Sequence, residues 1–297
     1  MGALTNLSQD HLDFHPDMED YFRTKAELFD GRARTEVVCV DGEWGPRLVK
    51  DGTITVATTG DAHWTASGVT VSATGEQAFT AHGPDGSALD VELSLPGDFN
   101  VANALLAIAA LVAVGVDART AADGVAACGG VPGRLELVSA GAPVRGVVDY
   151  AHKTDAIVAV LTALRELSGG RLICVLGAGG ERDRGKRPAM GAAAAQGADV
   201  VIVTDDNPRA EDPAAIRAEV LAGAYRAATP ARIIEVGGRR AAIDEAVRLA
   251  EPGDVVAVLG KGHERGQEVA GEVLPFDDRT ELADALRARF GDLAGRP

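Results

Sequence analysis

The second half of the chain alternates short apolar runs with longer stretches in which apolar residues recur every three or four positions. The apolar runs, which predict strands, cover residues 146–149, 172–176, 200–204, 233–236 and 255–259. The stretches between them predict helices over residues 155–167, 188–196, 213–227 and 239–250. This strand–helix alternation predicts an α/β fold with a doubly wound, mostly parallel sheet.

The first part of the chain follows a different pattern. Between residues 35 and 95, runs rich in Val, Thr and Ile alternate with glycine-containing turns, and GPDG at 83–86 predicts a hairpin turn. Helices are predicted over residues 17–30, where Asp17 is a natural N-cap, and over 99–114 and 117–128. The segment CGGVPG at 128–133 is the best linker candidate. We therefore expect two domains, residues 1–131 and 132–297.

Composition narrows the class of protein. A length of 297 residues, 46% hydrophobic and 25% charged, is typical of two globular domains. The net charge of −15 disfavours nucleic-acid binding, since an acidic chain repels phosphate backbones. The longest uncharged apolar stretch, residues 101–116, is shorter than the roughly 18 residues of a membrane span. With no signal pattern at the N-terminus and no CxxC pair, we expect a cytoplasmic protein without a membrane or disulfide framework.

Four of the predicted strands end in segments rich in glycine and charge. These segments are DYAHK (149–153), GAGGERDRGKR (177–187), DDNPR (205–209) and GKGHE (260–264). Because ligands of open parallel sheets bind outside the carboxyl ends of the strands, all four are expected on one rim. Arg182 and Arg209 would hold a carboxylate there, and Asp206 and Glu264 an ammonium group, so the rim suits a zwitterion. The alternative for any single segment is a solvated loop edge.

The glycine-rich segments do not form a known phosphate loop. GKGHE resembles half of one, but the full GxxxxGK[ST] pattern does not occur among the 297 residues. GAGGERDRG lacks the GxGxxG spacing and the acidic partner of a dinucleotide site.

Lys25 is unusual because it falls among apolar positions of its helix. Met18, Phe22 and Phe29 recur at spacings of four and seven, and Lys25 lies between them. A partly desolvated lysine has a depressed pKa, and its neutral amine can take up carbon dioxide as a carbamate, an oxygen ligand suited to magnesium. His11 could be a second ligand. The alternative, which the pattern alone favours, is a lysine that extends its ammonium group to solvent.

Asn100 and Asn103 open the predicted helix after LPGD. Asn100 suits a helix N-cap, whereas Asn103 has no capping need and could bind the edge of a nucleobase. The sequence pattern alone favours the capping role.

Taken together, these segments resemble the Mur ligases, and within them the MurE branch. The matching strings are TNLSQDHLDFH with MEDYFRTK, LPGDFNVANALLA, VPGRLELV, VVDYAHKTDA, GAGGERDRGKRP, VTDDNPRAEDP and GKGHERGQ, in the family's order. The resemblance implies part of a central ATPase domain followed by a Rossmann-like C-terminal domain. It also implies an ATP- and magnesium-dependent ligase that adds meso-diaminopimelate to UDP-MurNAc-L-Ala-D-Glu through an acyl phosphate. It gives no indication of the oligomeric state.

The resemblance also implies roles for individual residues. Lys25, as a carbamate, and His11 match the family's catalytic magnesium ligands. The positions that match ATP-binding residues are Asn100, Asn103, Arg134 and Asp149, with Lys153 next to them. The positions that match the diaminopimelate site are Arg182, Asp206, Asn207, Arg209, Gly260 and Glu264.

Two departures from the family pattern affect these expectations. AHKTD at 151–155 replaces the more usual AHTPD or AHKPD, which affects the loop around Lys153. The strings also correspond to the C-terminal three-fifths of a Mur ligase, without its GTNGKT-type phosphate loop. We therefore expect the chain by itself to be inactive. The alternatives are a non-catalytic module that binds diaminopimelate or muropeptides, and an inactive gene fragment.

Overall fold

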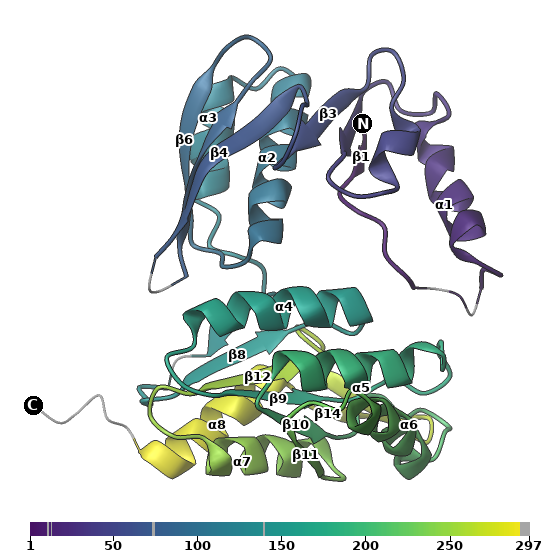
Figure 1. Cartoon of the computed structure of the whole chain (residues 1–297), viewed down its shortest axis with the longest axis vertical. Coiled ribbons are helices and arrows are strands. Elements are labelled where there is room, and N and C mark those ends of the chain that lie inside the picture. The colour runs from purple at the N-terminus through teal and green to yellow at the C-terminus, as the bar shows by residue number, and fades with distance from the viewer. Residues whose placement is uncertain (11, 13, 73–74, 139, 292–297) are drawn as a thin grey trace, which may run out of the picture. The chain divides into compact units, whose positions relative to one another are not determined.

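The computed structural model describes residues 1–291 with the exception of 11, 13, 73, 74 and 139. The chain forms two compact units, Met1–Gly130 and Val131–Pro297, and each has its own six-stranded sheet (Figure 1). No helix in the described part of the chain is long and apolar enough to span a membrane.

The sheet of the first unit combines parallel and antiparallel strands. In spatial order its strands are β1 (Gly2–Leu4), β2 (Glu36–Cys39), β3 (Ile54–Ala57), β4 (Trp64–Val71), β5 (Gln77–His82) and β6 (Ala88–Leu93). Strands β1 to β4 pair in parallel, and β4 to β6 pair antiparallel. The GPDG turn joins β5 to β6, and Gly83 N donates to Ser87 O at 3.0 Å, which confirms the predicted hairpin.

Helices α2 (Asp98–Ala113) and α3 (Ala118–Ala126) cover this sheet. Leu105 and Ile108 of α2 are fully buried in one core with Val37, Val56 and Phe79 of the strands.

Helix α1 (Met18–Ala26) begins where the sequence predicted, because the Asp17 side chain accepts a hydrogen bond from Asp20 N at 2.8 Å. It ends earlier than predicted. The chain continues as the 3₁₀ turn η1 (Glu27–Phe29), so Phe29 reaches the core after a change of helical period. A second 3₁₀ turn, η2 (Gly45–Leu48), adds Leu48 to the same core.

The second unit is the mostly parallel α/β domain that the sequence predicted. Its sheet has the order β11 (Arg232–Glu235), β10 (Val200–Val203), β9 (Leu172–Leu176), β12 (Val255–Leu259), β8 (Arg145–Asp149) and β7 (Glu136–Val138). Only β7 in this sheet runs antiparallel to its neighbour among the described residues. Its helices are α4 (Thr154–Leu167), α5 (Lys186–Gly197), α6 (Pro213–Arg226), α7 (Arg239–Leu249) and α8 (Asp278–Phe290).

Helices lie on both faces of this sheet. Helix α4 lies beside α5 on one face, while α7 and α8 pack against the other face and share a core with the inward side chains of the strands (Figure 1). The chain leaves β9 towards α5 and leaves β12 towards α8. Adjacent strands that lead to opposite faces define the switch point at which open α/β sheets bind ligands.

The carboxyl ends of these strands are aligned. Leu259 at the end of β12 lies opposite both Asp149 and Leu176, and Leu176 lies opposite Val203. The four segments that follow these strands therefore share one edge of the sheet, as predicted. We call this edge, formed by residues 149–153, 177–187, 205–209 and 260–264, the rim.

The hairpin of β13 (Gly266–Val269) and β14 (Glu272–Pro275) was not predicted. It packs on the DDNPR segment, where Arg209 N donates to Glu268 O at 3.0 Å and Ala270 N donates to Arg209 O at 2.8 Å. Both strands are short and no side chain of theirs is fully buried, so no alternation of apolar and polar residues marks them.

Candidate functional site

The two aspartates of DDNPR have different partners. Asp205 is held by an ion pair with Arg217 and by Gly238 N, which donates to its Oδ2 at 2.8 Å. Asp206 is 8% exposed, and its Oδ2 lies 3.8 Å from Arg239 Nη1. Asp205 therefore anchors its loop to α6 and to the start of α7. Asp206 is buried and faces Arg239.

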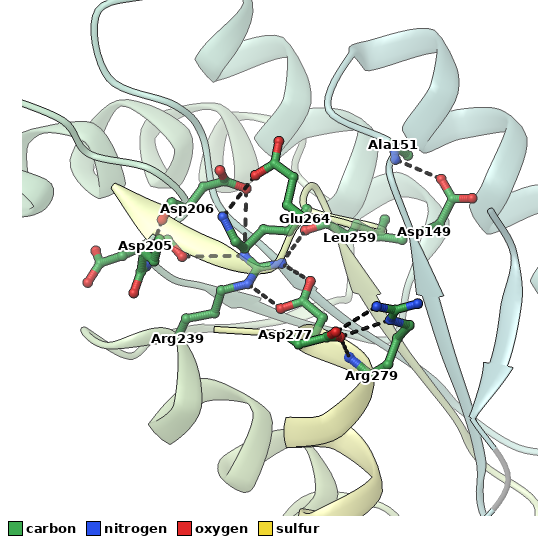
Figure 2. A network of polar contacts seen from close by, with 12 residues as sticks. Asp149, Ala151, Asp205, Asp206, Arg239, Leu259, Glu264, Asp277 and Arg279 are labelled. Carbon is green, nitrogen blue, oxygen red and sulfur yellow. Dashed lines mark hydrogen bonds and ion pairs between the residues drawn. The ribbon is translucent and has the colours of Figure 1, made fainter. Parts of the chain in front are cut away.

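Arg239, at the start of α7, lies beneath the rim and joins the ends of two strands to α8 (Figure 2). Its Nε and Nη2 each donate to Asp278 at 2.7 Å, and Nη2 also donates to Leu259 O at 2.9 Å. Burial by itself lowers the pKa of this guanidinium, but the Asp278 carboxylate more than offsets it and the net pKa is raised. Arg239 is thus a permanent positive charge under Asp206.

Asn207, Lys261 and Glu264 form a hydrogen-bonded cluster between the DDNPR and GKGHE segments. Lys261 Nζ donates to Asn207 Oδ1 at 2.8 Å and to Glu264 Oε2 at 3.0 Å, and its side chain is fully buried. Asn207 Nδ2 donates to the same Glu264 oxygen at 3.0 Å. The structure therefore brings together two predicted residues, Asn207 and Glu264, through a lysine to which the sequence analysis gave no role.

Both predicted arginines of the rim flank Gly179. A Cβ on that glycine would lie 3.2 Å from Arg209 Nη1 and 3.7 Å from Arg182 Cγ. Arg209 is well anchored, since Nη1 donates to Gly180 O at 2.7 Å and Nε lies 3.0 Å from Glu268 Oε2. Arg182 is exposed, and its guanidinium donates to Glu181 O at 3.4 Å. A ligand carboxylate could therefore bind Arg182 at little cost to existing contacts.

The glycines of the rim are required by the close packing of the rim loops against each other. Gly260 has a φ of +118°, and a Cβ there would lie 2.5 Å from Asp206 Oδ2. A Cβ on Gly180 would lie 2.0 Å from Pro208 O. These glycines let neighbouring loops approach each other closely.

A buried arginine stabilises the GAGGERDRG segment. Arg187 is fully buried, donates to Gly179 O at 3.1 Å and pairs with Glu211 at 2.8 Å. Hydrogen bonds from Arg187 and from Glu181 N lower the pKa of Glu211 to about 2. Sequence reasoning missed this pair because its members are 24 residues apart, Arg187 in the first turn of α5 and Glu211 just before α6.

Asp149 and Arg134 lie at the β8 side of the rim. Asp149 accepts hydrogen bonds from Leu135 N and Ala151 N, both at 2.7 Å, and burial raises the pKa of its carboxyl. Arg134 is exposed, with its guanidinium carbon 4.6 Å from the centre of the Tyr150 ring. Lys153 is the N-cap residue of α4 and is half-buried.

In the first unit, Asn100 and Asn103 lie on one side of the first turn of α2. Asn103 is exposed, and its Nδ2 donates to Asn100 Oδ1 at 3.3 Å. The capping role expected for Asn100 is wrong. The N-cap position is Gly97, and the Asn100 side chain donates to Pro96 O at 2.7 Å, so it holds the preceding loop and accepts no bond from a helix N–H.

The partial desolvation on which the carbamate hypothesis for Lys25 depended is not found, because the residue is exposed, as in the alternative that the sequence pattern favoured. Tyr21 and Phe22 are the buried residues of α1, and Lys25 Nζ lies 5.3 Å from the centre of the Tyr21 ring. Lys25 follows Tyr21 by one helical turn and covers that ring from the solvent side.

The other expected magnesium ligand, His11, lies outside the described residues. Among those that the structure describes, no three His, Cys, Asp or Glu side chains are grouped to hold a metal ion. The magnesium role of Lys25 and His11 therefore stays a prediction.

A cavity of about 540 Å³ lies at the opposite end of the second sheet from the rim. It is lined by Pro143, Arg145, Gly169 and Gly253, among others, near the amino ends of β8, β9 and β12. Ligands of this fold bind at the carboxyl ends, and the clustered charges are there too, so we assign the candidate site to the rim.

Comparison with known proteins agrees with this architecture. Residues 1–111 match the model of the Mur ligase middle domain, and residues 133–262 match the Mur ligase, glutamate ligase domain. The chain belongs to the Mur ligase family. Within that family it falls in the MurE branch, as its relatives indicate.

A UDP-N-acetylmuramoyl-L-alanyl-D-glutamate–2,6-diaminopimelate ligase of Streptomyces coelicolor is 51% identical over an alignment that covers 98% of this chain and 59% of the relative. The ligase of the same name from Corynebacterium glutamicum is 50% identical over 98% of this chain and 58% of the relative. The chain thus spans about three-fifths of the length of the curated relatives that it matches.

Solved structures show the same fold. A structure of a ligase with this name is 35% identical, with a TM-score of 0.60, over 97% of this chain and 60% of the other. A Mycobacterium tuberculosis folylpolyglutamate synthase, solved with ADP and AMPPCP, has a TM-score of 0.68 at 23% identity, over 99% of this chain and 64% of the other, and shares the fold alone.

Proposed function

We propose that this chain is the middle and C-terminal part of an ATP-dependent ligase that adds meso-diaminopimelate to UDP-MurNAc-L-Ala-D-Glu. The observation that carries the proposal is the rim, where Arg182 and Arg209 flank one glycine while Asp206 and Glu264 lie on the two neighbouring loops. The names of the relatives that are 50% and 51% identical support the same substrates.

Diaminopimelate carries two carboxylates and two ammonium groups, and the rim offers partners for both. In this proposal Arg182 and Arg209 hold the carboxylate that lysine lacks, by charged hydrogen bonds. Asp206 and Glu264 hold the ammonium group at the other end, the Nδ2 group of Asn207 is a donor for the neighbouring carboxylate, and Gly260 keeps the loop close to Asp206. These contacts orient the incoming amine towards the activated glutamate.

ATP supplies the phosphoryl group that converts the glutamate carboxylate into an acyl phosphate. The amine then attacks the acyl carbon, and inorganic phosphate leaves. Asn100, Asn103, Arg134 and Asp149 are proposed to bind the nucleotide, with Lys153 next to them. The exposed guanidinium of Arg134 on the Tyr150 ring is suited to an anionic or aromatic group.

Lys25 as a carbamate, together with His11, is proposed to bind magnesium. The support for this proposal is the match of TNLSQDH and MEDYFRTK to the family's strings, since the exposed Lys25 lacks the desolvation that would favour a neutral amine.

Amino-acid choice tests the proposal. The 297-residue chain should bind meso-diaminopimelate more tightly than L-lysine in calorimetry, by roughly 10- to 150-fold, the equivalent of one charged hydrogen bond of about 1.5–3 kcal/mol. Arg209→Ala should remove the preference. Equal affinity of the unmutated chain for both ligands would show that the rim does not select diaminopimelate.

A second candidate, a module that binds diaminopimelate without catalysis, rests on the location of the site. All six proposed amino-acid ligands lie in the unit Val131–Pro297. The 297 residues contain no GxxxxGK[ST] pattern to hold the triphosphate, so we expect this polypeptide alone to bind the amino acid and to release no phosphate from ATP. Phosphate release that depends on the dipeptide substrate and diaminopimelate would contradict that expectation.

A further inference from the structure

Lys261 is a fully buried cation that contacts two of the rim ligands proposed above. Its side chain has no exposed surface, yet its ammonium lies between Asn207 Oδ1 at 2.8 Å and Glu264 Oε2 at 3.0 Å. An ammonium group is costly to bury, so a lysine in this position must be compensated by close partners. Both partners are proposed ligands of the amino acid.

The donors around Asn207 fix the orientation of its amide. Lys261 Nζ and Glu268 N can only donate, and both point at Oδ1, at 2.8 and 3.0 Å. The Nδ2 group must therefore face Glu264 Oε2, where it donates at 3.0 Å. Because Oε2 accepts from both Lys261 and Asn207, Glu264 can offer its other oxygen, Oε1, to a ligand.

The charged side chains among the proposed amino-acid ligands and their direct contacts are largely matched in pairs. Arg209 pairs with Glu268 and Arg239 with Asp278, at 3.0 and 2.7 Å, and Lys261 pairs with Glu264. Asp206 and Arg182 add one charge of each sign. A ligand without net charge, such as diaminopimelate at neutral pH, suits such a balance better than lysine, which carries one excess positive charge.

We propose that Lys261 is a positioning and specificity-determining residue of the amino-acid site. It orients the Asn207 amide, occupies one oxygen of Glu264, and supplies the buried positive charge that favours a ligand with a second carboxylate. The inference rests on the proposed function and adds to it a residue that contacts the ligand only through its neighbours.

The test removes the charge of Lys261 with and without loss of its hydrogen bonds. Lys261→Gln keeps a donor near Asn207 and Glu264 but removes the charge, and Lys261→Met removes both. Affinities of the 297-residue chain for meso-diaminopimelate and L-lysine are measured by calorimetry. In either variant the ratio of the two affinities should shift towards lysine by at least about tenfold, because the lost charge no longer attracts the carboxylate that lysine lacks.

A matched control is Lys50→Met, which removes a lysine–glutamate pair with Glu36, 3.0 Å apart, in the other unit. It should leave the ratio unchanged. If Lys261→Met does not fold, Lys261→Gln decides the question.

A general loss of structure would weaken both ligands together, so a parallel loss with an unchanged ratio in the folded variants overturns the inference. Failure of the unmutated chain to prefer diaminopimelate would instead overturn the proposed function.

Discussion

Gly260 and Asp206 lie so close together that no side chain fits between them: a Cβ on Gly260 would be 2.5 Å from Asp206 Oδ2. Gly260 also has a φ of +118°, which disfavours any side chain. A single carbon added at Gly260 would therefore displace the Asp206 carboxylate, a proposed ligand of the amino acid, from its place above Arg239.

We expect Gly260→Ala to lower the affinity for meso-diaminopimelate by at least about tenfold and to destabilise the second unit by about 2–4 kcal/mol, through backbone strain and overpacking. Calorimetry and urea unfolding of the chain measure the two effects. Gly253→Ala is the matched control, since Gly253 has a φ of +90° and open space around it. It should lower stability by only about 1–2 kcal/mol and leave affinity unchanged.

Arg239→Met should destabilise the second unit by about 3–5 kcal/mol, because it leaves the fully buried Asp278 carboxylate without its partner. The double variant Arg239→Met/Asp278→Leu removes both charges and should recover a large part of that loss. Urea unfolding of the single and double variants is the measurement. Equal stability of the two variants would mean that Asp278 is not the cause.

Stability at acid pH should depend on Glu211. Its folded-state pKa is lowered from 4.5 to about 2, so its contribution is fully present above pH 4.5 and is lost as the pH falls towards 2. Glu211→Gln should remove about 2–3 kcal/mol of stability at pH 7 and flatten the decline between pH 5 and 2. Glu272→Gln, an exposed change on β14, should leave that decline as it is. If the stability of Glu211→Gln still declined as steeply between pH 5 and 2, that decline would be due to other groups.

Lys25 can be tested in a chimera that joins the preceding segment of the Streptomyces coelicolor relative to this chain. We expect Lys25→Ala to reduce ligation by at least about 100-fold, since it removes the amine that would carry the carbamate, and short-chain acids to restore part of it by supplying a carboxylate oxygen. Phosphate release is the readout, and Arg23→Ala, an exposed neighbour on α1, is the control. Full activity of Lys25→Ala would limit Lys25 to its contact with Tyr21.

The sequence by itself determined the framework of the second unit. Alternation of Val-rich runs with amphipathic stretches predicted its five parallel strands and four of its helices, because burial on both faces requires near-continuous apolar runs. The carboxyl-end rule then placed Arg182, Asp206, Asn207, Arg209, Gly260 and Glu264 on one rim. The sequence also predicted the cap at Asp17 and the turn at GPDG, which are local.

Only the tertiary structure decided which charges are compensated and by what. Arg239 and Asp278 are 39 residues apart, and Lys261 and Asn207 are 54 apart, so no local spacing links them. Phe29 reaches the core only through the 3₁₀ turn that follows α1, so the apolar spacing that placed Lys25 on a buried face does not describe one continuous helix, and Lys25 is exposed. Periodicity shows which face of an element is buried, but the partner of a buried charge depends on which loops the sheet order brings together.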